Sequence, residues 1–150
     1  MSRDQERPIW IVDDDSDDHQ LIREIFADMG WEYPLELFSA ADQMFKRLGE
    51  APAAPFIIIA DVNLPRMDGF TLREKTLKAP NNKFHSVPFI FWSTQASEAQ
   101  VRKAYRLCAH GFFLKEAQYN EWKRSLVRII EYWTSSLTPS KEDKPDPPLN

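Results

Sequence analysis

An unusual density of carboxylates follows the first apolar run of the chain. The stretch I-V-D-D-D-S-D-D (residues 11–18) places five aspartates within six positions, directly after the apolar residues Ile9–Val12. Like charges this close repel one another, so a folded protein needs a reason to keep them together. Three explanations are open: a solvated acidic loop, a group of carboxylates that begins a helix, or a cation site.

Polar side chains also follow three of the later apolar runs. They are Asp61 and Asn63 after Phe56–Ala60, Ser93 and Thr94 after Pro88–Trp92, and Lys115 after Gly111–Leu114. Carboxylates and other hard oxygen ligands suit Mg²⁺, and a lysine and a hydroxyl suit the charge on a phosphoryl group. An aspartate beside such a cation can itself attack phosphorus. If these runs are neighbouring strands, the sequence predicts a metal-assisted phosphoryl-transfer site.

The elements that would position these groups alternate regularly. Short apolar runs predict strands at 9–12, 34–38, 56–60, 88–92 and 111–114. Amphipathic spacing predicts helices at about 16–29, 39–48, 70–78, 97–109 and 118–136. Five β-α units in sequence predict a parallel sheet with helices on both faces, a three-layer α/β/α arrangement. Ligands of such sheets bind beyond the carboxyl ends of the strands, which is where the polar groups fall.

Composition limits the class of protein. A chain of 150 residues with net charge −4 and interspersed signs favours one folded domain without a basic face for nucleic acid. The lone cysteine, Cys108, favours a reducing compartment, and no apolar run is long enough to span a membrane. We therefore expect a cytoplasmic protein, with an N-terminal tail at 1–7, a folded domain at 8–136, and a disordered Pro-rich tail at 137–150.

Four motifs, taken in order, resemble those of bacterial two-component response regulator receiver domains. They are V-D-D at 12–14, D-x-N-L-P-x-x-D-G at 61–69, a hydroxyl at Ser93 and a lysine at Lys115. The resemblance covers about residues 9–133 and implies a flavodoxin-like, doubly wound five-stranded sheet of order 2-1-3-4-5. The 61–69 motif and the polar segment 79–86 also resemble single-domain regulators that pair with phytochrome-type kinases and often form homodimers.

The resemblance implies a role for each matching residue in phosphoryl acceptance. Asp61 is expected to be the phosphoacceptor. Asp13, Asp14, Asp61 and the backbone carbonyl of Asn63 are expected to hold Mg²⁺, with Asp14 as the more direct ligand and Asp13 acting mainly through water. Lys115 is expected to contact the phosphoryl group.

Further roles concern switching and the lifetime of the phosphoryl group. Ser93 and Phe112 are expected to form the switch pair, with Ser93 also on the phosphoryl group, and Asn63 and Gln95 to control water access. Two departures from the family pattern stand out: Glu116 replaces the proline that usually follows the lysine, and Phe112 lacks the hydroxyl of a tyrosine.

Other conspicuous residues have structural explanations. Asp17 and Asp18 fit the first turn of a helix capped by Ser16. Cys108 is expected to pack as a small residue of the fourth helix, and Trp133 to be exposed for a partner. The histidines share no metal-ligand spacing and are expected on the surface or in loops: His19, His85 and His110.

The functional expectation is a stand-alone receiver that takes a phosphoryl group from a histidine kinase or phosphotransfer protein onto Asp61. It would be no turnover enzyme, and it would signal through the fourth helix, fifth strand and fifth helix, where such domains bind targets or dimerise. One alternative is an interaction module of the same fold with vestigial phosphorylation and constitutive binding. Another is an α/β phosphatase or phosphotransferase with a D-x-D nucleophile; Asn63 in place of the second aspartate argues against it.

Overall fold

Strands and helices alternate along the whole folded chain. The computed structural model describes residues 7–50, 54–79 and 84–138. Its elements are β1 (Ile9–Val12), α1 (Ser16–Met29), β2 (Leu35–Phe38), α2 (Ala41–Glu50), β3 (Ile57–Asp61), α3 (Gly69–Leu77), β4 (Phe89–Ser93), α4 (Glu98–Arg106), β5 (Gly111–Leu114) and α5 (Tyr119–Ser135). The predicted five β-α units are therefore confirmed.

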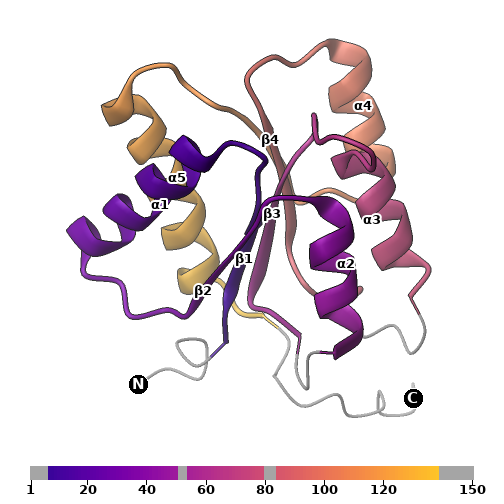
Figure 1. The fold of residues 1–150 in the computed structure, drawn as a ribbon, viewed down its shortest axis with the longest axis horizontal. Coiled ribbons are helices and arrows are strands. Elements are labelled where there is room, and N and C mark those ends of the chain that lie inside the picture. Colours follow the sequence, from indigo (N-terminus) through magenta and orange to yellow (C-terminus); the bar gives the residue numbers. More distant parts are fainter. Residues whose placement is uncertain (1–6, 51–53, 80–83, 139–150) are drawn as a thin grey trace.

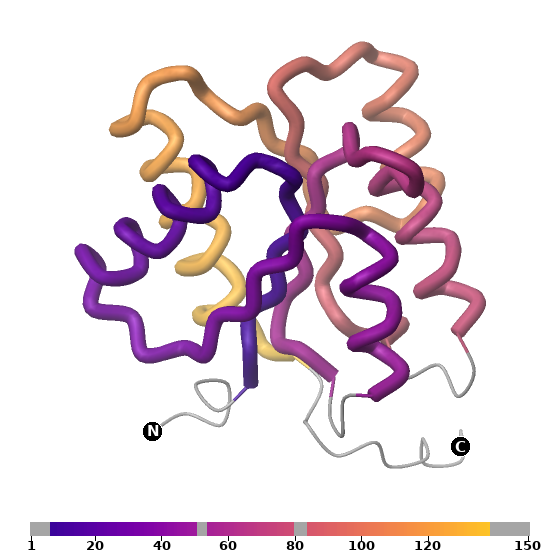
Figure 2. Tube along the Cα trace, viewed as in Figure 1, coloured from indigo at the N-terminus to yellow at the C-terminus, as the bar shows by residue number. Residues whose placement is uncertain are grey.

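The five strands form one parallel sheet of order β2-β1-β3-β4-β5. Helices α1 and α5 cover one face, and α2, α3 and α4 cover the other (Figure 1). The chain reverses its direction of travel across the sheet between β1 and β3, which creates the switch point where such sheets bind ligands. The turns that follow β1, β3, β4 and β5 lie at one end of the sheet (Figure 2). The predicted doubly wound, three-layer fold is confirmed.

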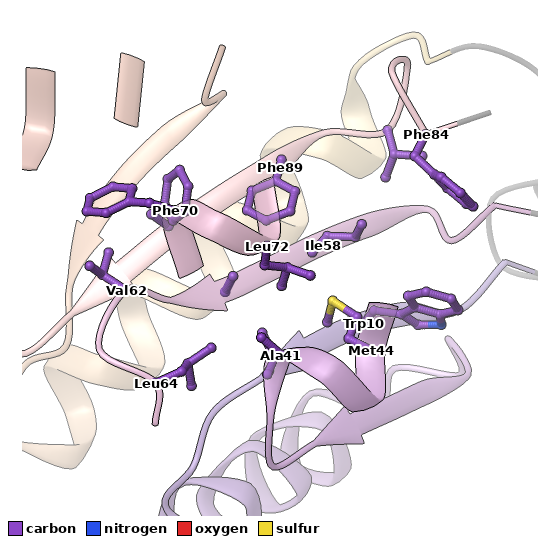
Figure 3. Close-up of a cluster of buried hydrophobic side chains, with 14 of the residues drawn as sticks. Trp10, Ala41, Met44, Ile58, Val62, Leu64, Phe70, Leu72, Phe84 and Phe89 are labelled. Atoms are coloured by element: carbon purple, nitrogen blue, oxygen red, sulfur yellow. The ribbon is translucent and has the colours of Figure 1, made fainter. Parts of the chain in front are cut away.

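Two hydrophobic cores hold the helices to the sheet. Because successive side chains of a strand point to opposite faces, β1 sends Trp10 and Val12 to one core and Ile9 and Ile11 to the other. Figure 3 shows the first core, between the sheet and the helices α2 and α3. Its labelled members are Trp10, Ala41, Met44, Ile58, Val62, Leu64, Phe70, Leu72, Phe84 and Phe89. Because the strands are packed on both faces, the backbone positions of the polar residues at their ends are fixed.

The end of α4 differs from the sequence prediction. The helix stops at Arg106, and Cys108 is exposed with a left-handed φ of 60°. The prediction that Cys108 packs inside the fourth helix is therefore wrong. The end is anchored by Arg73 of α3, whose buried guanidinium donates to the carbonyl oxygens of Leu107 (2.9 Å) and Cys108 (3.0 Å). The other end of α4 is held locally, by a capping box between Ser97 and Gln100.

The end of α5 also differs from the prediction. Trp133 is half-buried and meets the ring of His110 edge-on at 5.6 Å, whereas the neighbouring Tyr132 is the exposed aromatic residue. Most of the predicted tails, 1–7 and 137–150, lies outside the described residues, as do residues 80–83 of the polar segment. Within the described ranges, no helix has the length and apolar character needed to cross a membrane.

Candidate functional site

Residues far apart in the sequence meet at the carboxyl end of the sheet. Asp13 follows β1, Asp61 ends β3, Ser93 ends β4 and Lys115 follows β5. Parallel pairing of these four strands places their carboxyl ends together at one end of the sheet. Asp13 and Ser93 are fully buried and Asp61 is nearly so, so the groups sit in a pocket where electrostatic interactions are stronger than in water.

Three carboxylates at this end of the sheet form one cluster. Asp13, Asp14 and Asp61 each offer an oxygen, and these oxygens lie within 4.8 Å of one another. Backbone N–H groups orient two of them: Asp15 donates to Asp13 Oδ1 at 2.9 Å, and Asn63 donates to Asp61 Oδ1 at 3.0 Å. Several convergent carboxylate oxygens are a donor set that suits a small hard divalent cation such as Mg²⁺.

Lys115 is the counter-charge of the cluster. Its Nζ donates to Asp13 Oδ2 (2.5 Å), Asp61 Oδ2 (2.7 Å) and Asp18 Oδ2 (3.0 Å), and its side chain is 7% exposed. Burial opposes the ammonium, yet the neighbouring carboxylates, Asp13 first, raise the pKa of Lys115. Burial also raises the pKa of Asp61, and that of Asp13 to about 7, against the lowering effect of Lys115. Burial thus accounts for the raised pKa of the two carboxyl groups, and the surrounding carboxylates account for the raised pKa of the lysine.

Asp18 belongs to this site, although sequence reasoning placed it only at a helix start. The helix cap is also different from the prediction, because Asp15 and not Ser16 caps α1, accepting from the Asp17 N–H at 2.8 Å. Asp18 lies in the first turn of the helix and is 97 positions from Lys115. The sequence does not distinguish a first-turn aspartate that pairs with a distant lysine from one that faces water. The one available signal was Lys115 itself, because a buried lysine needs carboxylate partners.

His19 was also misplaced by the sequence prediction. It is buried rather than on the surface, and its Nε2 lies 2.6 Å from the carbonyl oxygen of Asp13. The ring therefore ties the first turn of α1 to the end of β1. His85 and His110 lie on the surface, as expected, and the ring of His110 is partly covered by Trp133.

The hydroxyl of Ser93 is held by two neighbours. Asn63 Nδ2 donates to Ser93 Oγ at 3.1 Å, and the Gln95 N–H donates to the same oxygen at 3.3 Å. Both contacts use Oγ as an acceptor, so the hydroxyl proton remains available for a further acceptor. Phe112, on the neighbouring β5, is half-buried with its ring 6.2 Å from that of Phe91.

The loop between β3 and α3 passes very close to Asp61. The Gly69 N–H donates to the Val62 carbonyl at 3.0 Å, and a Cβ at Gly69 would lie 2.3 Å from the carbonyl oxygen of Asp61. Glycine is therefore required at this position. Arg66 in the same loop has a φ of 68°, a left-handed conformation that costs energy for a residue with a side chain.

A cavity of about 410 Å³ adjoins Lys115 on the side of α1 and α5. Its lining combines apolar side chains with acidic ones: Leu21, Ala117, Tyr119 and Trp122 with Asp15, Asp18 and Glu116, together with Thr94 and Lys115. Asp18 and Lys115 thus lie between the acid cluster and this cavity.

Comparison with known families agrees with this geometry. The sequence matches the response regulator receiver domain family over residues 9–126. The chain belongs to this family. Receiver domains are signalling proteins rather than enzymes that turn over a separate substrate. They act with histidine kinases or phosphotransfer proteins, and they bind Mg²⁺ or Mn²⁺ in an acidic pocket, so the cluster around Asp61 has the character expected of the family.

Individual proteins resemble this receiver domain over most of its length. Chemotaxis protein CheY1 of Helicobacter pylori J99 is 28% identical over 122 residues, which are 81% of this chain and 95% of that protein. The phosphorylated cyanobacterial phytochrome response regulator RcpA has a TM-score of 0.82 at 22% identity, covering 90% of this chain and 99% of RcpA. The Mn²⁺-bound form of response regulator Rcp1 has a TM-score of 0.78 at 19% identity, covering 89% of this chain and 99% of Rcp1. These structural likenesses concern the fold.

Proposed function

We propose that this receiver domain accepts a phosphoryl group on Asp61 from a histidine kinase or a phosphotransfer protein. The observation that carries the proposal is the set of hydrogen-bond donors and carboxylates around Asp61. One oxygen accepts from the Asn63 N–H and the other from the Lys115 ammonium, beside the carboxylates of Asp13 and Asp14. A nucleophilic carboxylate needs such donors, because they fix its direction and stabilise charge on the incoming group.

Asp13, Asp14, Asp61 and the backbone carbonyl of Asn63 are the residues that would hold Mg²⁺. The three convergent carboxylates fit an ion that prefers oxygen ligands, and the Mn²⁺-bound form of the similar regulator Rcp1 supports the assignment. When bound, Mg²⁺ supplies positive charge against the carboxylates and the phosphoryl oxygens.

The chain's own residues account for the transfer step. An oxygen of Asp61 attacks phosphorus, the new O–P bond forms, and the P–N bond to the donor imidazole breaks with its electron pair staying on nitrogen. Lys115 and the free hydroxyl proton of Ser93 would stabilise the phosphoryl oxygens during this displacement. Asn63 and Gln95, which both hold Ser93 Oγ, would set how easily water reaches the product.

The output of the phosphorylated domain would be protein–protein contact. Ser93 is the last residue of β4, and Phe112 lies in the neighbouring β5. The elements α4, β5 and α5 each carry an exposed apolar side chain: Tyr105, Leu114 and Tyr132, respectively. We propose this surface for target binding or homodimerisation in the cytoplasm. The likeness to the phytochrome response regulator RcpA favours a phytochrome-type kinase as the donor. Constitutive binding with vestigial phosphorylation is the competing function.

Phosphoryl acceptance is tested by incubation with Mg²⁺ and phosphoramidate, followed by intact-protein mass spectrometry. The wild type should gain the mass of one phosphoryl group, and Asp61→Asn should gain none. Asp42→Asn, which removes an exposed carboxylate on α2, is the matched control and should be labelled like the wild type. Labelling of Asp61→Asn would refute the acceptor assignment, and an unlabelled wild type would favour the vestigial alternative. Light scattering of the labelled and unlabelled protein tests phosphorylation-driven dimerisation, which an unchanged mass would contradict.

A further inference from the structure

The three carboxylates around the Lys115 ammonium are not equivalent. Two of them, Asp13 and Asp61, also belong to the cluster whose oxygens converge within 4.8 Å, whereas Asp18 does not. Asp18 also comes from a different kind of element: it lies in the first turn of α1 and lines the cavity on the other side of the lysine. Lys115 therefore has one carboxylate partner that a cation in the cluster would not engage.

We propose that Asp18 is a positioning residue, which keeps the Lys115 ammonium beside Asp61 when a divalent cation occupies the acid cluster. The inference rests on the proposed function. A carboxylate that shares its charge with a divalent cation is a weaker acceptor for a neighbouring ammonium. Asp13 and Asp61 would both be weakened in this way, and Asp18 would then be the strongest partner left to Lys115.

The structure offers Lys115 an alternative place if Asp18 is removed. The cavity of about 410 Å³ adjoins the ammonium, and Glu116, the next residue in the chain, contributes a second carboxylate to the cavity lining. Without Asp18, the lysine could turn into this space and away from the phosphoryl group. The Asp18 carboxylate, 3.0 Å from Nζ, opposes that movement.

Asp18 itself is well fixed. The first turn of α1 is capped by the side chain of Asp15, and the ring of the adjacent His19 bonds the carbonyl oxygen of Asp13. The helix turn that carries Asp18 is thus tied to the strand end that carries Asp13. A carboxylate carried on a fixed backbone has only its own side-chain rotamers to lose when it pairs with the lysine, which favours a positioning role.

The test compares two neighbouring carboxylates of the same helical turn. Asp17 is exposed and, like Asp18, interacts with the helix dipole, so Asp17→Asn and Asp18→Asn remove the same general helix-start interaction. With phosphoramidate and saturating Mg²⁺, Asp18→Asn should slow phosphoryl acceptance about tenfold, or about 1.4 kcal/mol, whereas Asp17→Asn should stay within about twofold of wild type. Asp18→Glu should recover most of the rate.

A double-mutant cycle separates positioning from structural damage. If Asp18 acts through Lys115, the substitution Asp18→Asn should have no further effect on the rate in a Lys115→Gln background. An undiminished tenfold effect in that background would overturn the inference, as would wild-type kinetics of Asp18→Asn or equal losses in the Asp17 and Asp18 variants. The proposed function fails separately, when the wild type itself takes no phosphoryl group.

Discussion

The close approach of Gly69 to the acceptor strand makes the substitution Gly69→Ala a demanding test of the site. The added Cβ would start 2.3 Å from the carbonyl oxygen of Asp61, and 3.1 Å from both the Asp61 carbonyl carbon and Val62 Cα. These are backbone atoms, so no side-chain rotation can relieve the contact. A C···O contact needs about 3.3 Å, so the loop and the end of β3 must separate by about 1 Å.

The expected cost follows from this displacement. Forcing an extra methyl group into a filled site costs roughly 1–3 kcal/mol, and alanine recovers at most about 1 kcal/mol of backbone entropy. The free energy of unfolding should therefore fall by roughly 0–3 kcal/mol, measured by urea denaturation. Because a misplacement of about 1 Å at reacting groups can cost about 100-fold in rate, phosphoryl acceptance from phosphoramidate should fall by roughly 10- to 100-fold.

Gly49 provides the matched control. It lies in α2, and a Cβ there would meet nothing within 4 Å. Gly49→Ala should therefore raise the free energy of unfolding by a few tenths to about 1 kcal/mol and leave phosphoryl acceptance unchanged. If Gly69→Ala is as stable as the wild type and is labelled at the wild-type rate, the close approach at Asp61 has no energetic importance and the reasoning is refuted.

Three further predictions address other parts of the molecule. Burial and the charge of Arg73 lower the pKa of His110, so the unfolded chain binds this proton more tightly than the folded one does. The contribution of His110 to the free energy of unfolding should therefore be complete above about pH 6.5 and decline below it. His110→Gln should flatten that decline in urea titrations across pH, and an unaltered profile would contradict the assignment. Arg66→Gly relieves a left-handed φ worth about 1–2 kcal/mol and costs up to about 1 kcal/mol of backbone entropy. The urea midpoint should therefore rise slightly, and a lowered midpoint would contradict the strain at Arg66. Mg²⁺ at about 100 times its Kd should stabilise the wild type by about 2.7 kcal/mol in thermal unfolding, and Asp61→Asn should lose most of this gain.

The sequence was informative wherever a residue's role depended on its place at a strand end. Buried apolar runs define the strands, and parallel pairing then brings Asp13, Asp61, Ser93 and Lys115 to one edge. The convergence of these residues was predictable for that reason. Their roles as phosphoacceptor, switch and metal ligands remain predictions.

The parts that sequence reasoning missed depend on contacts that no local pattern encodes. Asp18 and His19 look like ordinary residues of a helix's first turn, and only the packing of α1 against the strand ends brings them to Lys115 and Asp13. Cys108 continues the helical pattern of α4, yet the helix ends before it. Cys108 has a left-handed φ, and a buried arginine from another helix donates to the carbonyl oxygens at this end.

That arginine has a mechanical consequence for α4. Arg73 fastens the carboxyl end of the helix to α3, whereas the amino end is held by a capping box within its own first turn. A displacement of α4 would therefore be a swing about a fixed pivot rather than a translation. The amino end, which follows the Ser93–Gln95 turn, would travel farthest, so a small movement at the Ser93 hydroxyl would displace the first turn of α4 most and would diminish toward Arg73.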